Sequence, residues 1–340
     1  MSSVKRLDEV SFIRIIAALL ICLYHAFTCY NGGWKQPEGY VDILTYKWIA
    51  RLSFAFSLQA FVFISGYLFA YQRITLKRTA GVALISTKFK RLMLPSVIFS
   101  TLYFVLFKEY KGIWNCLYSI INGCGHLWYL PMLFWLFVLA YLLESLQLND
   151  KWKLLIVSFL NLTYTVNLPF PLQLSKASYY FVYFYGGFLC YKESDVIKSH
   201  LSFQNLSFAW LFFVVSFVLL RPLSDLLIAH TRIQKLILLV CIRISLLIYV
   251  WAGLIALYST TVYYLQRHSL SQFAQHFALC CFGFYLCQQF VLQLLYYKSR
   301  FPVLVGPYWL PWCGFILASA VSYSISTILV KTKIGRYLIG

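Results

Sequence analysis

The chain alternates between long apolar runs and short polar segments rich in lysine and arginine. Each apolar run approaches the roughly 20 residues that an α-helix needs to cross a bilayer. Residues such as Asn161 and Pro169 make the fifth and sixth runs the most polar and irregular. The pattern therefore predicts an all-α polytopic membrane protein, a helical bundle in a single domain over residues 1–340. The bundle is predicted to contain about ten transmembrane helices, at residues 9–29, 48–71, 92–107, 127–147, 152–168, 178–191, 203–220, 236–258, 273–296 and 308–330.

Composition supports this class, because the chain is 61% hydrophobic and only 11% charged, with a mean hydropathy of +0.73. No soluble domain of this size can bury so much apolar surface. The net charge of +19 does not indicate nucleic acid as a partner, since the basic residues are scattered in short loops. We expect membrane lipids around the chain and no nucleic acid.

The basic residues instead indicate topology. Alternate loops, starting with the segment that holds Lys5 and Arg6, contain the larger share of lysine and arginine. The positive-inside rule then predicts that both termini are cytoplasmic. We expect no cleaved signal peptide, because Arg14 interrupts the first apolar run, and no soluble domain fused after the last one.

The first helix, over Leu7 to Phe27, contains two residues that a bilayer disfavours. Arg14 and His25 are eleven positions apart, close to three helical turns, so both lie on nearly the same face about 16 Å apart. Small residues lie between them, and His25 is expected about halfway across the membrane. Ionisable groups at such depth usually mark function. The alternative is structural: an arginine paired with a neighbouring helix and a histidine bonded to a backbone carbonyl.

Further basic residues lie near the predicted membrane surfaces. Arg51 begins the second span on the outer side. The loop before the third span holds Lys88, Lys90 and Arg91 at the inner face. Such cations can bind a phosphorylated ligand or anionic lipid headgroups, or they can serve only as a topology signal. At the end of the second span, Ser65-Gly66 is expected to let another backbone approach closely.

Three later segments carry other candidates. His126 and Trp128 open the fourth span at the predicted outer surface, as sugar contacts or as part of an aromatic belt. Glu144, near the other end of that span, is expected to pair with a neighbouring arginine. The ninth span contains a set of polar residues that we interpret as interhelical contacts. They are Gln288, Gln289 and Gln293.

The ten cysteines have no framework spacing, and most fall inside apolar runs. Cys116 and Cys124 share one predicted outer loop and can form a disulfide in an oxidising compartment. No CxxC motif and no cluster of histidine and cysteine indicates a metal site.

Several segments, in this order along the chain, resemble motifs of acyltransferase family 3, the integral-membrane acyltransferases that O-acylate cell-surface glycans. They are RIIAALLICLYH (Arg14, His25), FVFISGYL (Phe61, Phe63, Ser65, Gly66, Tyr67), KFKRLMLP (Lys88, Arg91, Pro95), GHLWYLP (His126, Trp128) and CCFGFYLCQQFVL (Gly283, Tyr285, Leu286). In the last segment the chain departs from the family pattern. Cys281 or its neighbour replaces a serine, and Cys287 or Gln288 fills a histidine position.

The resemblance implies transfer of an acyl group, with acetyl as the expected group, from a cytoplasmic acyl-CoA (acetyl-CoA) co-substrate to a hydroxyl of a saccharide or lipid-linked saccharide. It implies no tightly bound cofactor and a bacterial cytoplasmic (inner) membrane location. His25 and Arg14 are the predicted catalytic residues, His25 either as general base or as acyl carrier. Arg14 also heads the predicted CoA-binding set, with Lys88 and Arg91. The predicted substrate-binding set is Arg51, His126 and Trp128.

Two other functions fit the same pattern. A transporter or flippase for a lipid-linked saccharide also has buried arginines and aromatic-lined cavities. The chain shows no inverted repeat and no matching pair of broken helices. A non-catalytic membrane partner in a polysaccharide export complex is the third interpretation. Release of free CoA with the right acceptor separates the enzyme from both.

Overall fold

The computed structural model describes residues 7–77, 81–164, 171–199, 201–225 and 232–339, so Lys5, Arg6 and Pro169 lie outside the described residues. Helices dominate these ranges, which contain no β-strand. Eight of the helical segments found there are long and apolar enough to cross a bilayer. The predicted all-α polytopic membrane fold is therefore confirmed.

The α-helices lie close to the predicted spans, with short additional helices between them. They are α1 (Asp8–Phe27), α2 (Leu44–Phe54), α3 (Ser57–Ile74), α4 (Gly81–Phe107), α5 (Ile113–Asn122), α6 (Tyr129–Ser145), α7 (Asp150–Thr163), α8 (Leu174–Lys192), α9 (Ser194–Ser199), α10 (Phe203–Leu220), α11 (Arg232–Leu265), α12 (Gln272–Tyr297), α13 (Phe301–Lys331) and α14 (Lys333–Ile339).

Two of the ten predicted spans fall short of a membrane-crossing helix among the described residues. The span predicted at 152–168 corresponds to α7, whose 14 residues extend only about 21 Å. The span predicted at 178–191 corresponds to α8, which has 19 residues. Serines, glycines and tyrosines lower its hydropathy, and α8 is not among the eight.

The basic segment before the third span forms part of a helix, not the predicted loop. Lys88, Lys90 and Arg91 all lie within α4, which begins at Gly81 and continues through Pro95. Lysine and arginine are good helix formers, and their long side chains can extend towards water while the backbone stays helical. Pro95 has no N–H, so the carbonyl of Arg91 loses its usual intrahelical donor.

The chain forms two compact units. Unit 1 comprises residues 1–13, 59–85 and 135–270, and unit 2 comprises residues 14–58, 86–134 and 271–340. The single domain predicted over residues 1–340 stays a prediction.

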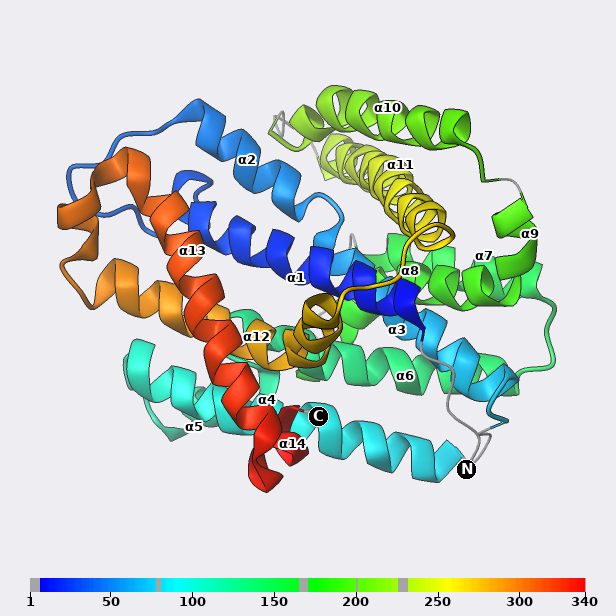
Figure 1. The fold of residues 1–340 in the computed structure, drawn as a ribbon, viewed down its shortest axis with the longest axis horizontal. Helices are drawn as coiled ribbons and strands as arrows, with labels where there is room; N and C mark the ends of the chain where they lie inside the picture. The colour runs from blue at the N-terminus through cyan, green and yellow to red at the C-terminus, as the bar shows by residue number, and fades with distance from the viewer. Residues whose placement is uncertain (1–6, 78–80, 165–170, 200, 226–231, 340) are drawn as a thin grey trace. The chain divides into compact units, whose positions relative to one another are not determined.

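Within unit 1, α3 and α8 pack with their backbones in contact. A Cβ atom at Gly66 would lie 1.8 Å from the carbonyl oxygen of Phe184, and one at Gly187 would lie 1.9 Å from that of Phe63. Neither position can hold a larger side chain without separating the helices. The close approach predicted at Ser65-Gly66 is therefore confirmed. In the same unit, α10 and α11 run side by side (Figure 1).

Charged and polar groups of unit 1 form their own contacts. Lys153 donates to Glu144 over 2.9 Å, so the predicted arginine partner of Glu144 is wrong and the partner is a lysine. Lys192 pairs with Asp150. The guanidinium group of Arg243 lies 4.7 Å from the ring centres of both Tyr164 and Tyr179, which are themselves 5.4 Å apart.

Unit 2 is built around α12 and α13, which lie side by side (Figure 1). The hydroxyl of Tyr296 on α12 donates to the backbone oxygen of Ala26 over 2.9 Å and so ties α12 to α1. The loop after α1 is bound in the same way, because Tyr40 donates to the carbonyl of Pro302 over 2.8 Å. Tyrosine hydroxyls therefore tie the end of α1 to α12 and the loop after α1 to α13.

Candidate functional site

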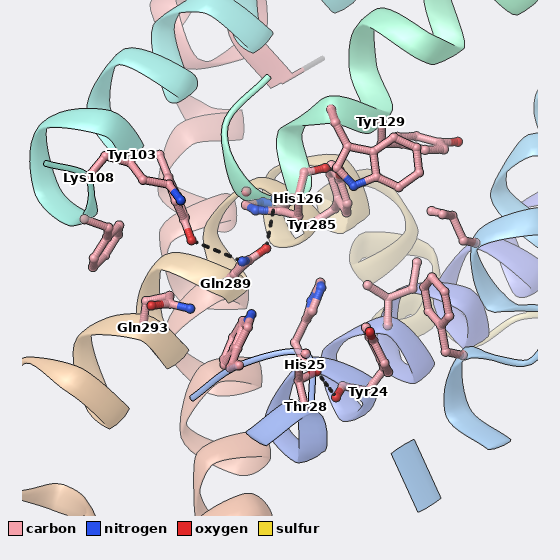
Figure 2. A pocket seen from close by; sticks show the side chains of 18 residues that line it. Tyr24, His25, Thr28, Tyr103, Lys108, His126, Tyr129, Tyr285, Gln289 and Gln293 are labelled. Atoms are coloured by element: carbon pink, nitrogen blue, oxygen red, sulfur yellow. Dashed lines mark hydrogen bonds between the residues drawn. The ribbon is translucent and has the colours of Figure 1, made fainter. Parts of the chain in front are cut away.

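A cavity of about 530 Å³ lies within unit 2. Most of its lining comes from α1 and the loop that follows it, from α4, from the short 3-10 helix Gly125–Trp128 before α6, and from α12, with one residue each from α2, α3 and α6. His25 and His126 both line it, from different elements (Figure 2). The volume lies within the range of pockets that hold small molecules.

His25 lies in the last turn of α1. It is about 26 Å along the helix axis from Asp8, near the end of α1 at Phe27, and its predicted depth about halfway across the membrane stays a prediction. The side-chain amide of Gln288 lies against its Nδ1 atom, with Oε1 at 3.0 Å and Nε2 at 2.8 Å. Trp34 stacks on the imidazole, with the two rings nearly parallel and their centres 5.9 Å apart.

His126 is only 6% exposed, so it is buried among unit 2 helices and does not lie on an open outer surface. Its backbone N–H donates to Oε1 of Gln289 over 3.1 Å, and its carbonyl accepts from the hydroxyl of Tyr285. Its ring nitrogen Nε2 lies 3.2 Å from the carbonyl oxygen of Leu286. The ring centres of His126 and His25 are 6.1 Å apart.

The contact with Leu286 decides which ring nitrogen of His126 carries the proton. A carbonyl oxygen only accepts hydrogen bonds, so Nε2 must be the N–H and Nδ1 must carry the lone pair in the neutral ring. Nδ1 has no hydrogen-bond partner in the part of the chain that the structure describes. His126 therefore keeps one buried acceptor atom beside the cavity.

Aromatic rings make up much of the cavity wall, including those of Trp34, Trp128, Tyr24 and Tyr129. Figure 2 shows Gln289 hydrogen-bonded to His126 on one side and to the hydroxyl of Tyr103 on the other. Aromatic faces with a few placed polar groups are typical of sites that bind small organic molecules.

The predicted CoA-binding cations also come together in unit 2. Lys88 interacts electrostatically with both Arg91 and Arg14, so like charges from α4 and α1 lie near one another. In the described ranges Arg14 forms no ion pair with a carboxylate; its electrostatic neighbours include Cys281. Cations grouped in this way favour a bound polyanion.

Arg14 and His25 lie on one continuous helix, as the sequence predicts, about 16 Å apart along its axis. Ala18 and Cys22 lie between them and are fully buried, at 2% and 0% exposure. The small side chains on that face leave the backbone of α1 closely packed against its neighbours.

Arg51 does not line the cavity. It is buried on α2, and its guanidinium group lies over the ring of Trp48, 5.5 Å from the ring centre. The structure thus brings together His25, His126 and Trp128 of the predicted set at one cavity and leaves Arg51 outside its lining.

Cys116 and Cys124 are both free thiols in the structure. The backbone N–H of Cys124 donates to the hydroxyl of Ser100 over 3.1 Å. Burial raises the pKa of the Cys124 thiol above its usual value, which keeps it protonated and poorly reactive at neutral pH.

Sequence analysis did not assign the α12 residues that hold the two histidines. It interprets Gln288 and Gln289 only as interhelical contacts, and it gives Tyr285 no role in the site. The available signal was a pair of adjacent amides in the apolar middle of a helix. That signal indicates a polar partner on another helix but does not say which one.

A family model described as an acyltransferase domain matches residues 7–331, nearly the whole chain. No curated protein and no solved structure shows a significant match to this chain.

Proposed function

The chain belongs to this acyltransferase family, and on that premise we propose that it moves an acyl group, acetyl in the first instance, from acyl-CoA to a hydroxyl of a cell-surface or lipid-linked saccharide. The observation that carries the proposal is the pair of histidines, His25 and His126, on one aromatic-walled cavity. Histidine is the usual base for taking a proton from an alcohol near neutral pH.

The donor side of the proposal rests on the cations. Arg14, Lys88 and Arg91 bind the phosphates of acyl-CoA, since guanidinium and ammonium groups are the usual partners of phosphate. The separation of about 16 Å between Arg14 and His25 is of the order of a pantetheine arm. One ligand can therefore have its phosphates near Arg14 and its thioester near His25.

The chemical step follows from the position of His25. Its imidazole takes the proton of the acceptor hydroxyl while the hydroxyl oxygen attacks the thioester carbonyl. The tetrahedral intermediate then collapses, the C–S bond breaks, and the imidazolium returns its proton to the departing CoA sulfur. Acylation of His25 itself, followed by transfer to the acceptor, is the alternative route.

The acceptor side consists of the cavity wall. Trp128 provides an aromatic face for a sugar ring, and His126 a hydrogen-bonding contact. Substrate binding by Arg51, which does not line the cavity, stays a prediction from the sequence. We propose the bacterial inner membrane as the location, with both termini cytoplasmic, so that acyl-CoA arrives from the cytoplasm.

The experiment uses the full chain purified in detergent, with radiolabelled acetyl-CoA and an envelope glycan fraction from the producing cells. Free CoA and labelled glycan are both measured. His25→Ala is expected to lower transfer by about 10²- to 10⁴-fold, the usual contribution of a general base. The matched control is His268→Ala, since His268 is an exposed histidine that does not line the cavity.

Two results would overturn the proposal in different ways. If His25→Ala transfers as fast as the wild type, the base lies elsewhere. If the wild type releases no CoA and labels no glycan, the proposed transfer of acetyl from acetyl-CoA to the glycan is wrong. A flippase for a lipid-linked saccharide then becomes the leading function.

A further inference from the structure

We propose that Gln288 is the positioning residue of His25. Its amide oxygen accepts the Nδ1–H of His25 and leaves Nε2 with the lone pair that acyl transfer requires. The catalytic consequence rests on the proposed function, whereas the assignment of the proton to Nδ1 does not.

Gln288 is placed to act on a single group. It lies on α12, is fully buried, and its amide lies against Nδ1 of His25 at 3.0 Å through Oε1 and 2.8 Å through Nε2. A ring nitrogen makes one such bond at a time. If the amide nitrogen donates, Nδ1 holds the lone pair and Nε2 the proton. If the amide oxygen accepts, the two are exchanged.

The neighbouring histidine shows which arrangement α12 favours. Two residues before Gln288 on the same helix, the carbonyl of Leu286 accepts the Nε2–H of His126 over 3.2 Å. An oxygen of α12 thus fixes the proton on one nitrogen of His126 and leaves the other nitrogen bare. With its amide oxygen facing His25, Gln288 does the same for the second histidine, on the opposite ring nitrogen.

Chemistry favours the same choice. A neutral histidine acts as a base only through its unprotonated nitrogen, and a hydrogen bond at the other nitrogen fixes which one that is. Gln288 occupies Nδ1, so a hydroxyl in the cavity can reach only Nε2. With the amide oxygen on Nδ1, that accessible nitrogen is the base. If the amide nitrogen donated to Nδ1 instead, Nε2 would carry the proton and could not act as the base.

An amide also suits the location better than a carboxylate does. A charged side chain inside a membrane-spanning helix is costly, and Gln288 has no exposed surface through which water could solvate a charge. An amide fixes the tautomer without adding charge. It stabilises the imidazolium less than a carboxylate would, so its contribution is orientation of the ring.

The test is nitrogen NMR of the full chain in detergent micelles, with the six histidines isotopically labelled and the signals of His25 identified by their loss in His25→Ala. The expected wild-type spectrum shows His25 protonated at Nδ1 and bare at Nε2. Gln288→Leu is expected to abolish that preference. Gln288→Glu, which keeps an acceptor oxygen at the same reach, is expected to retain it.

Gln289→Leu is the matched control, because Gln289 is the adjacent amide and bonds to the backbone of His126. It should leave the His25 tautomer unchanged. The proposal is wrong if wild-type His25 carries its proton on Nε2. This outcome is measured on the wild type and does not depend on whether any variant at position 288 folds. The proposal is equally wrong if His25 keeps its tautomer in folded Gln288→Leu protein.

Transfer rates separate this inference from the proposed function. Gln288→Leu is expected to lower transfer by about 10- to 100-fold, part of what the base itself contributes, and Gln288→Glu to restore some of it. If the spectra are as expected but the wild type transfers no acyl group, the proposed function fails and the tautomer assignment stands. If Gln288→Leu transfers at the wild-type rate, the positioning role fails and the function stands.

Discussion

The two units bury polar side chains in different ways. In unit 1 charged groups neutralise one another: Glu144 and Lys153 form a largely buried pair, and Asp150 and Lys192 form an exposed one. In unit 2 the two cavity histidines are held by neutral partners, an amide and a backbone carbonyl. A charge that is neutralised by its partner contributes to structure. An imidazole held through one nitrogen keeps the other available for reaction.

This difference explains why unit 1 offers polar clusters without an evident reactive group. Tyr185 donates to both Glu144 and Asp150, at 3.5 and 3.4 Å, and so links the two ion pairs. Arg243 contacts the rings of Tyr164 and Tyr179. Each of these contacts joins two helices of unit 1. We therefore expect substitutions in the two units to separate stability from transfer.

Breaking the Glu144–Lys153 ion pair of unit 1 should have the largest effect, a loss of stability. In Glu144→Ala the ammonium group of Lys153, whose side chain is 8% exposed, would lose its carboxylate partner. Removal of one partner from a buried pair costs about 3–5 kcal/mol. We expect the free energy of unfolding in detergent to fall by that amount, while folded protein keeps its transfer rate.

The double variant Glu144→Leu/Lys153→Met is the control, since it removes both charges. It should recover most of the lost stability, because apolar residues replace buried ion pairs at little cost. Equal stability of Glu144→Ala and the wild type would show that water solvates the Glu144–Lys153 pair. The contrast between a stabilising ion pair in unit 1 and neutral partners in unit 2 would then fail.

His126→Phe should have the next largest effect, and this effect should be on the rate of acyl transfer and not on stability. Phenylalanine keeps the ring contacts with Tyr285 and Phe290 but removes both ring nitrogens. We expect transfer to fall by about 10- to 100-fold, the value of one or two hydrogen bonds to substrate. The thermal midpoint should change far less than in Glu144→Ala, and a larger loss of stability than of transfer would contradict the comparison.

Lys88→Ala tests the cation cluster, with a smaller expected effect. Loss of one charge-assisted hydrogen bond to phosphate should raise the KM for acetyl-CoA about tenfold with little change in kcat. Lys90→Ala, two residues further along α4, is the matched control, because Lys90 is exposed on the same helix. Equal KM values for the two variants would exclude Lys88 from donor binding.

Arg51→Ala should have the smallest effect on transfer, because Arg51 does not line the cavity. We expect less than about a threefold change in rate, the range of an indirect contact. The predicted role of Arg51 in binding the acceptor would instead give a loss comparable to that of His126→Phe. Measuring both variants with the same acceptor decides between these expectations.

The fold was largely predictable because each spanning helix carries its own signal. The apolar run that begins near Asp8 predicts α1, and helical periodicity correctly puts Arg14 and His25 on one continuous helix. The same approach failed at α4. Lys88, Lys90 and Arg91 indicate a loop when only hydropathy is considered, although lysine and arginine are compatible with a helix.

The site was predictable only in part, because its contacts join distant segments. Helical periodicity singled out Arg14 and His25, the start of the fourth span singled out His126 and Trp128, and resemblance to family motifs then joined them in one predicted site. The contact between His25 and Gln288 spans 263 positions. Neither periodicity nor hydropathy contains information on which helix faces which at that separation, so the partner of His25 came from the structure.

The length of α11 has a consequence for the membrane that can hold this protein. Its candidate span Gln234–Leu265 has 32 residues and contains an 18-residue window with a mean hydropathy of 2.3. A helix of that length extends about 48 Å, whereas the hydrocarbon layer is about 30 Å thick. Tilt alone would have to reach about 50°, beyond the roughly 40° seen for spanning helices. Part of α11 therefore stands outside the hydrocarbon, and the thickness of the host bilayer decides how much of its apolar surface meets water.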